Sequence, residues 1–241
     1  MPFVQLDTVE STNTYAMQLV QEGLASHGHT VFAHEQTAGK GQRGKVWNAD
    51  PNSNIIVSVV LDTAFLQLRQ QFLLSMAVAS AVHEFYSHFG GDETRMKWPN
   101  DIYWQNRKAG GILIENIVRG SLWKWAVVGV GLNINQARFP EHLHKAVSLK
   151  QITGKEFDVV ELTKKLCGYL DKYYRQLVAN GGEGLLQRYN DFLYKRGEQV
   201  KLKKENVVFS CTVDGVSSSG QLLVSGALYH AFSFGEVEWV I

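Results

Sequence analysis

Apolar side chains repeat at helical spacing in three segments of the chain. Residues 11–22, 66–89 and 158–180 place them three or four positions apart, and glycines follow each segment. This period predicts three helices, each with one buried face. Asp158 followed by Glu161 is typical of a capping-box start for the third helix.

Shorter apolar segments predict strands. Residues 54–61 form a nearly continuous apolar run, as in a strand buried on both faces. Residues 94–98, 111–118 and 122–128 follow, with a tight turn at 119–120 between the last two. From about residue 197, short apolar stretches alternate with Asp-Gly and Ser-Gly turns, which predicts a small all-β unit.

Composition and charge exclude several classes of protein. The 241 residues are 45% hydrophobic and 20% charged, enough for one sizeable core and a small appended domain. A net charge of +1 argues against a nucleic-acid or membrane surface, so any anion site must be local. Cys167 and Cys211 lack metal-ligand or CxxC spacing, which favours reduced thiols. With neither a signal peptide nor a membrane-length apolar run, we expect a cytoplasmic protein.

The segment GKGQRGKVW, from Gly39 to Trp47, carries the clearest chemistry. Its glycines can supply positive φ angles and inward N–H groups, while Lys40, Arg43 and Lys45 add positive charge. The segment predicts a phosphate-handling loop, although it does not match the G-x-x-x-x-G-K-[ST] motif. For the loop alone, a flexible solvated hairpin is the alternative.

Four further motifs accompany this loop. They are STN at 11–13, KWPND at 97–101, RKAGGILIEN at 107–116 and VVGVGLNIN at 127–135. In this order and spacing they resemble the signature of the biotin protein ligases, strongly over about the first 135 residues.

The resemblance implies an α+β fold. A mixed β-sheet flanked by helices would occupy residues 1–192, and a small SH3-like barrel would occupy residues 193–241. It also implies an ATP-dependent, AMP-forming ligase that converts biotin to biotinyl-5'-AMP, with Mg²⁺ accompanying ATP. The acceptor would be a lysine of a biotin carboxyl carrier protein or domain.

Joining two anions requires fixed cations, because biotin carboxylate and ATP repel each other and charge develops on the phosphoryl oxygens. Arg43, Lys45, Lys97 and Lys108 are the candidates. The resemblance places Lys108 against both the biotin carboxylate and the adenylate, as the first catalytic candidate, with Arg43 as a further catalytic cation. Without the flanking motif, Lys108 would be interpreted as an exposed hairpin lysine.

The KWPND motif delivers Asp101 at the end of a strand, because proline cannot continue the ladder. Its carboxylate could hold the incoming carrier lysine or a Mg²⁺ ion, and Asp101 is the third catalytic candidate. Hydrogen bonding within the turn is the alternative. Gly111 and its neighbour Gly110 fit close approach to a ligand, and equally a β-bulge.

The VVGVGLNIN strand has glycines that leave room for a flat ligand. By resemblance Gly129 lies against biotin, and Asn133 contacts the adenine edge. A buried strand with packing glycines is the competing interpretation, and both can hold together. No side-chain metal site is assigned.

Biotin needs an apolar pocket with a few convergent hydrogen-bonding groups. Ser11, Thr12, Asn13 and Gln36 match the polar set, and Trp47 supplies an apolar wall. STN alone would also serve as a helix N-cap. Three further residues of the loop complete the expected biotin contacts: Lys40, Gly41 and Gln42.

Gln42 stands where many members of this family have arginine, so one charged ligand contact is absent. We expect activity to persist, because the glutamine can still donate hydrogen bonds. The STN motif already begins at residue 11, which favours a ligase without an operator-binding domain and without nucleic acid as a partner. We expect this ligase to be a monomer or a homodimer. The rival interpretations are a lipoate or octanoate ligase and a non-catalytic biotin or nucleotide sensor.

Overall fold

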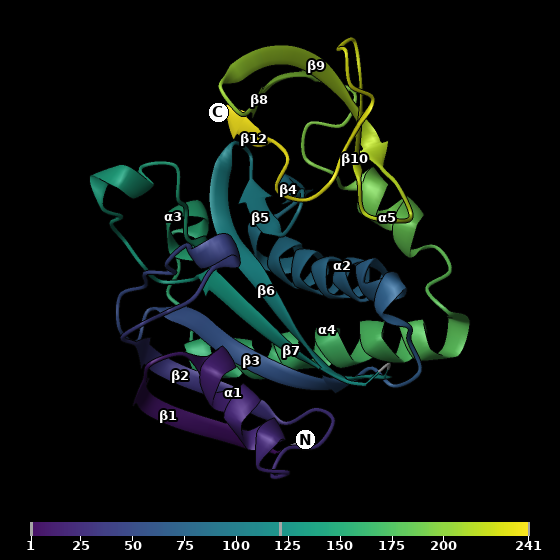
Figure 1. The fold of residues 1–241 in the computed structure, drawn as a ribbon. Coiled ribbons are helices and arrows are strands. Elements are labelled where there is room, and N and C mark those ends of the chain that lie inside the picture. Colours follow the sequence, from purple (N-terminus) through teal and green to yellow (C-terminus); the bar gives the residue numbers. More distant parts are fainter. Residues whose placement is uncertain (1, 121, 241) are drawn as a thin grey trace.

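The computed structural model describes residues 2–120 and 122–240 and contains a seven-stranded mixed sheet (Figure 1). Its spatial order is β1-β2-β3-β7-β6-β5-β4. The β1–β2 pair is parallel and the other pairs are antiparallel. The strands are β1 (Phe3–Val9), β2 (Thr30–Gln36), β3 (Asn54–Asp62), β4 (Thr94–Lys97), β5 (Asp101–Trp104), β6 (Arg107–Arg119) and β7 (Leu122–Asn133).

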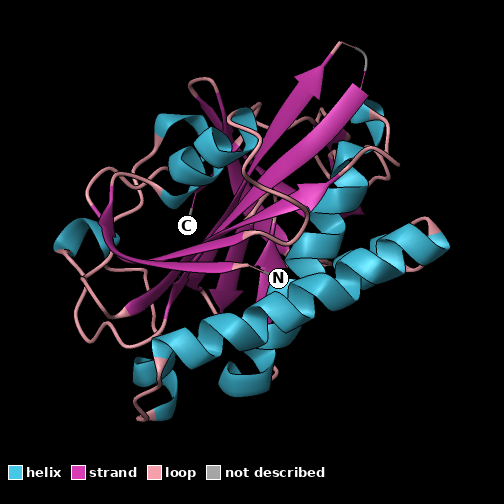
Figure 2. Cartoon of the chain, turned by 90° about the horizontal axis from the view of Figure 1, so that it is seen from below, coloured by secondary structure: helices cyan, strands magenta, loops and turns pink. Residues whose placement is uncertain are grey.

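Helices cover both faces of this sheet. The long helices α2 (Gln71–Gly90) and α4 (Val159–Asn180) pack together on one face (Figure 2). The shorter α1 (Thr12–Gln21) packs on the other face, where Ala16 and Val20 contact a small cluster with Val60 of β3. Every residue of β3 before Asp62 is buried, so the prediction of a strand buried on both faces is confirmed.

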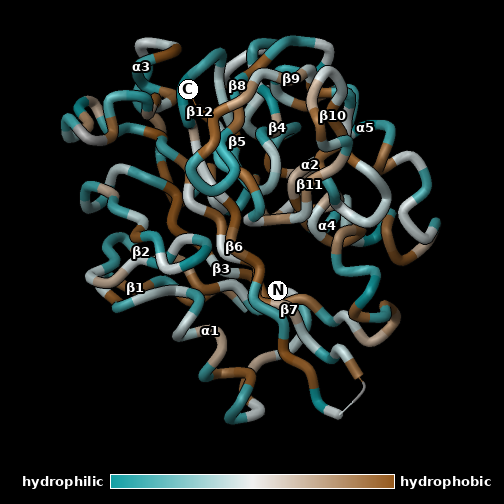
Figure 3. Tube along the Cα trace, turned by 45° about the horizontal axis from the view of Figure 1, so that its top comes forward, coloured by the Kyte–Doolittle hydropathy of each residue, from teal (hydrophilic) through white to brown (hydrophobic). Residues whose placement is uncertain are grey.

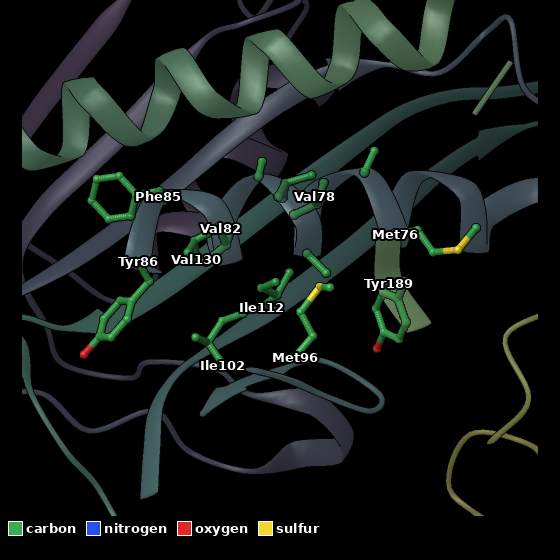
Figure 4. Packing of buried hydrophobic residues seen from close by; sticks show 14 of the residues in the cluster. Met76, Val78, Val82, Phe85, Tyr86, Met96, Ile102, Ile112, Val130 and Tyr189 are labelled. Carbon is green, nitrogen blue, oxygen red and sulfur yellow. The ribbon is translucent and has the colours of Figure 1, made fainter. Parts of the chain in front are cut away.

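The main core lies between α2 and the sheet. Figure 4 shows Val82 of α2 beside Val130 of β7, and Met76 and Phe85 of α2 and Ile112 of β6 belong to the same buried cluster. The apolar stretches of β6 and β7 run through the middle of the molecule (Figure 3). Burial of each such side chain contributes about 2 kcal/mol to the stability of the fold. This packing holds the central strands in a fixed register.

The three predicted helices are present, with one displaced start. Ser11 caps α1, and the Asp158 carboxylate accepts a hydrogen bond from the Glu161 N–H at the start of α4. Gly181 ends α4 in the left-handed region. The prediction that α2 starts near residue 66 is wrong, because residues 68–70 form a separate 3₁₀ turn that changes the chain direction.

Several short or half-exposed elements were not predicted. β1 and β2 lack a continuous apolar run in their sequence, and β5 has only four residues. The helices α3 (Leu149–Thr153) and α5 (Leu185–Asp191) are too short to show a helical period.

A second, five-stranded antiparallel sheet follows, consistent with the expected SH3-like unit. Its order is β11-β10-β9-β8-β12. It docks on the first sheet through Trp98, whose indole N–H donates to the Gly220 carbonyl at 2.9 Å. The strands are β8 (Gln199–Lys204), β9 (Val207–Val216), β10 (Leu222–Ser225), β11 (Ala231–Phe232) and β12 (Glu238–Val240).

Within the described ranges, none of the helices combines the length and the apolarity needed to span a bilayer.

Candidate active site

An open cavity of ≈ 700 Å³ lies where the two sheets meet. Its walls come from the start of α1, the glycine loop, the β4–β5 turn, the middle of β6 and β7, and the segment 234–239 of the second sheet. The fold brings together nearly all the predicted site residues. Those lining the cavity are Ser11, Thr12, Asn13, Gln36, Lys40, Gly41, Gln42, Arg43, Lys45, Trp47, Lys97, Asp101, Lys108, Gly111 and Gly129.

Lys108 and Asp101 form an ion pair inside the cavity. Lys108 Nζ lies 2.7 Å from Asp101 Oδ1, and both side chains are partly accessible. Asp101 opens β5 and pairs with Gly111 of β6, where an added Cβ would lie 3.4 Å from the Asp101 oxygen and 3.6 Å from Lys108 Nζ. Gly111 therefore lies in contact distance of the pair and lines the same cavity. The β5–β6 ladder also shifts register between Ile102 and Tyr103, so the alternative of a bulge is present as well.

The glycine loop is an ordered hairpin. The Trp47 N–H donates to the Gly39 carbonyl at 2.9 Å, and the Gly41 N–H donates to the Lys45 carbonyl at 2.7 Å. The expectation that its glycines supply the positive φ angles is only partly right. Gly44 has φ 75°, but Arg43 also takes a left-handed φ of 56°, and Gly41 is extended.

Arg43 crosses from this loop to the second sheet. Its Nη1 donates to the Gly235 carbonyl at 2.9 Å, and its guanidinium lies 6.0 Å from the centre of the Phe234 ring. No sequence pattern predicts this contact, because the partners are separated by 192 positions. One wall of the cavity is therefore fixed by a bond between the two units.

Lys97 is a buried cation at the same junction. Its residue is 7% exposed, and its ammonium lies 4.8 Å from the Tyr103 ring centre and 5.1 Å from that of Trp239. Burial lowers the pKa of Lys97 to about 8; nearby Asp101 opposes this, while Lys108 adds to it. The charge of Lys97 is consequently sensitive to mildly alkaline pH.

Polar groups converge at the other end of the cavity, around the start of α1. Gln36 Oε1 accepts from the Thr12 N–H at 2.8 Å and from the Thr12 hydroxyl at 3.1 Å. Ser58 Oγ lies 2.8 Å from Thr12 Oγ1 and 2.6 Å from Asn13 Oδ1. Ser11 caps α1 and also lines the cavity, so the helix-cap role and the expected biotin contact are compatible at this position.

Glu115 holds Asn13 in place, and Gly129 leaves room for it. The Asn13 amide donates to Glu115 Oε2 at 2.8 Å, and an added Cβ at Gly129 would collide with the Asn13 amide. Ser58 and Glu115 were both missed in the sequence. Their signal was a polar residue inside an apolar strand: Ser58 interrupts NIIVSVVL, and Glu115 follows GGILI.

Trp47 supplies the flat apolar wall. An added Cβ at Gly131 would lie 2.5 Å from Trp47 Cε2, so the indole packs directly on this glycine of β7. Lys108 Nζ lies 5.9 Å from the Trp47 ring centre, which places the wall next to the ion pair.

Asn133 lies outside the cavity lining. It is 4% exposed, and its amide donates to the Lys108 carbonyl at 3.3 Å. It therefore supports the strand that carries Lys108, because it ends β7 beside that strand. The expected contact of Asn133 with adenine stays a prediction.

The Biotin/lipoate A/B protein ligase family profile matches residues 6–133, more than half of the chain. The chain belongs to this family. The matched region holds the ion pair, the glycine loop and the polar groups at the start of α1, so the family's characteristic segment forms most of the cavity.

Individual members of the ligase family match over most of the chain. A bifunctional ligase/repressor BirA of Bacillus spizizenii is 28% identical over 221 residues, covering 90% of this chain and 67% of the relative. A biotin–[acetyl-CoA-carboxylase] ligase of Paracoccus denitrificans is 28% identical, and the match covers 92% of this chain and 93% of the relative. A biotin protein ligase from Aquifex aeolicus, solved in complex with biotin and ATP, superposes with a TM-score of 0.81 at 26% identity. The superposition covers 98% of this chain and 97% of the Aquifex chain.

The carboxylates of this ligase cavity suit a metal ion that arrives with ATP. Asp101 and Glu238 line the cavity. In the described part of the chain, no three His, Cys, Asp or Glu side chains gather as a metal-binding group. Mg²⁺ in such enzymes is held by one or two carboxylates and by the substrate's phosphates. The residues therefore fit Mg²⁺ carried by the nucleotide.

Proposed function

We propose that the chain is an ATP-dependent biotin protein ligase in which Lys108 and Asp101 act at the reacting centre. The observation that carries the proposal is the 2.7 Å ion pair between these two side chains, set in a cavity that polar groups and further cations also line. Relatives named as biotin–[acetyl-CoA-carboxylase] ligases and a neighbour solved with biotin and ATP support the substrates.

The first reaction joins biotin to AMP. A carboxylate oxygen of biotin attacks the α-phosphorus of ATP, and pyrophosphate leaves with the electron pair of the broken P–O bond. Lys108 neutralises the repulsion between the carboxylate and the α-phosphate, and its partner Asp101 keeps its ammonium oriented. Arg43, Lys45 and Lys97 supply further positive charge for the departing pyrophosphate.

The second reaction transfers biotin to the carrier. The lysine amine of the carrier attacks the acyl carbon of biotinyl-AMP, and AMP leaves. Asp101 is the carboxylate placed to accept the proton that the lysine loses, because it lies in the open cavity beside Lys108. A biotin carboxyl carrier domain of a biotin-dependent carboxylase is the proposed acceptor, as the names of the relatives suggest.

Biotin binds at the α1 end of the cavity in this proposal. Thr12, Asn13 and Gln36, with Ser58 behind them, offer donors and acceptors for the ureido ring, and Trp47 covers the apolar rings. The glycine loop residues Lys40, Gly41 and Gln42 border the same space.

We also propose a division into a catalytic unit, residues 1–192, and a C-terminal unit, residues 193–241. The end of α5 at Asp191 and the start of β8 at Gln199 support this boundary. A net charge of +1 supports a protein carrier rather than nucleic acid as the partner. We propose a cytoplasmic enzyme, either monomeric or homodimeric.

The test is transfer to a carrier. The purified protein is incubated with ATP, Mg²⁺, biotin and a biotin carboxyl carrier domain, and with lipoate in a parallel reaction. We expect the mass of the carrier to rise by one biotinyl group only in the biotin reaction. Transfer of lipoate without biotin would favour a lipoate ligase, and binding of biotin without transfer would favour a sensor.

A further inference from the structure

Lys97 has an unusual environment for a buried cation. Its residue is more than nine-tenths buried, yet its ammonium has no hydrogen bond or ion pair with any residue in the described ranges. Its contacts are the faces of two aromatic rings, Tyr103 and Trp239. A buried lysine ordinarily requires a paired charge. Asp101 attracts this charge through space, but in the described ranges no side chain bonds it directly, and an anionic ligand in the cavity that Lys97 lines would supply that direct partner.

The cavity is built for an anion with several charges. Its lining contains five basic side chains, Lys40, Arg43, Lys45, Lys97 and Lys108, against two carboxylates, Asp101 and Glu238. Asp101 is already paired with Lys108. A polyphosphate is the ligand chemistry that balances this excess of positive charge.

Trp239 comes from the second sheet, on β12, and is held firmly. Its indole N–H donates to the Trp98 carbonyl at 3.1 Å, and its ring lies 5.7 Å from that of Tyr194. Figures 1 and 3 both show β12 beside β5 and close to the end of the first sheet. The ring that faces Lys97 is therefore anchored to the neighbouring residue of the KWPND segment.

An aromatic ring holds an ammonium group without using its N–H donors. The attraction is between the charge and the face of the ring, so the ammonium keeps its net positive charge and can still donate an N–H to a phosphate oxygen. A carboxylate in the same place would occupy the donors and cancel the charge. Burial also lowers the pKa of Lys97 to about 8, which a bound polyphosphate would reverse.

We propose that Trp239 is a positioning residue, which holds Lys97 toward the triphosphate of ATP and so makes the C-terminal sheet part of the nucleotide site. This inference rests on the proposed function for the identity of the polyphosphate. Arg43 has a parallel attachment, since Gly235 and Phe234 of the same segment contact its guanidinium. The segment 234–239 thus orients two cations from separate parts of the first unit.

The test is direct binding of α,β-methylene-ATP with Mg²⁺, measured by calorimetry, so that no turnover is needed. We expect Trp239→Leu to weaken analogue binding about tenfold, as loss of a buried cation–π contact implies. Biotin affinity, measured in the same samples, should change less than twofold. Trp239→Phe keeps a ring face and should restore most of the affinity.

A double-mutant cycle assigns the effect to Lys97. Lys97→Met should also weaken analogue binding, and Trp239→Leu should then add less than a further twofold. Tyr229→Leu is the matched control, because it removes a similar contact between a lysine and a ring in the same unit. Lys204 Nζ lies 4.1 Å from the centre of the Tyr229 ring, and neither residue lines the cavity. It should leave both affinities unchanged.

Three results would overturn the inference: equal losses of biotin and analogue binding in Trp239→Leu, additive effects of the two substitutions, or wild-type affinity in Trp239→Leu. These outcomes are separate from the proposed function. Failure of the wild-type protein to biotinylate a carrier would reject the ligase proposal, while the binding cycle would still decide the role of Trp239.

Discussion

At the residue scale, the ion pair of Lys108 and Asp101 connects the sequence to the chemistry. An ion pair between an exposed lysine and a carboxylate contributes little to stability. Within a cavity the lysine is a charge whose orientation is fixed before the substrates bind. Gly111 places no side chain beside the pair, and an added Cβ there would be in van der Waals contact with both charged groups.

Replacement of Lys108 tests this directly. We expect Lys108→Met to slow formation of biotinyl-AMP by about a hundredfold, roughly 3 kcal/mol in the chemical step, because one preorganised electrostatic contact is lost. Rapid quench of a single turnover measures the rate. Lys155→Met, an exposed lysine outside the cavity, is the control and should keep the wild-type rate. A Lys108→Met enzyme with full adenylation would remove the catalytic assignment.

The titration of Lys97 makes a second prediction. Its pKa is lowered to about 8, so its positive charge is present below that pH and is lost as the pH rises through it. We expect the affinity for the ATP analogue to fall between about pH 7.5 and 9. In Lys97→Arg the guanidinium stays charged and the fall should be absent. An identical pH profile in the two proteins would contradict the assignment.

At the element scale, the sequence predicted the long elements well and the short ones poorly. Strand β3 showed a nearly continuous apolar run because it is buried on both faces, and helix α4 showed a clear helical period because it buries one face. The four-residue strand β5 and the half-exposed β1 carry too few apolar residues to show one. The start of α2 was predicted a few residues too early, because residues 68–70 form a 3₁₀ turn before the helix begins.

Gly129 of β7 gives a prediction about strand geometry. A Cβ there would meet the Asn13 amide, so Gly129→Ala should displace Asn13 and raise the biotin dissociation constant about tenfold or more, consistent with an overpacking cost of 1–3 kcal/mol. Gly168→Ala is the control, since nothing lies within 4 Å of an added Cβ in that turn of α4. It should leave biotin binding unchanged. Normal biotin affinity in Gly129→Ala would argue against Asn13 as a biotin contact.

Helix α2 contains a buried histidine with consequences for stability. His83 is 2% exposed, its Nε2 lies 3.1 Å from the Thr94 carbonyl, and burial lowers its pKa to about 4. The unfolded chain, with a pKa near 6.5, binds a proton first as pH falls. The free energy of unfolding should therefore decrease as the pH falls from about 6.5 towards 4.

Urea unfolding of wild type and His83→Gln measures this contribution. The amide can keep the hydrogen bond to Thr94 but does not titrate in this range. We expect the wild type to lose about 3 kcal/mol more than the variant between pH 7 and pH 4. Parallel losses in the two proteins would show that His83 does not titrate in this way.

At the scale of the whole molecule, the site is made by contacts that sequence patterns do not reveal. Nearly every site residue that the motifs predicted lines the cavity, but the lining residues of β3 and of segment 234–239 lie outside the motifs. Arg43 bound to Gly235, and Trp239 beside Lys97, join positions far apart in sequence, and only the packing of the two sheets creates them. Ser58 and Glu115 were absent from the prediction because one polar residue in a strand is a weak signal.

The central claim is that these cations hold biotin and ATP together while the acyl-AMP forms. A crystal structure of the protein bound to biotinyl-5'-AMP tests it most directly. We predict the phosphate of the adenylate within hydrogen-bonding distance of Lys108 and on the side of the cavity bordered by Arg43, with the ureido ring at the Thr12 and Gln36 end. An adenylate bound elsewhere, or in this cavity with its phosphate remote from Lys108, would contradict the account.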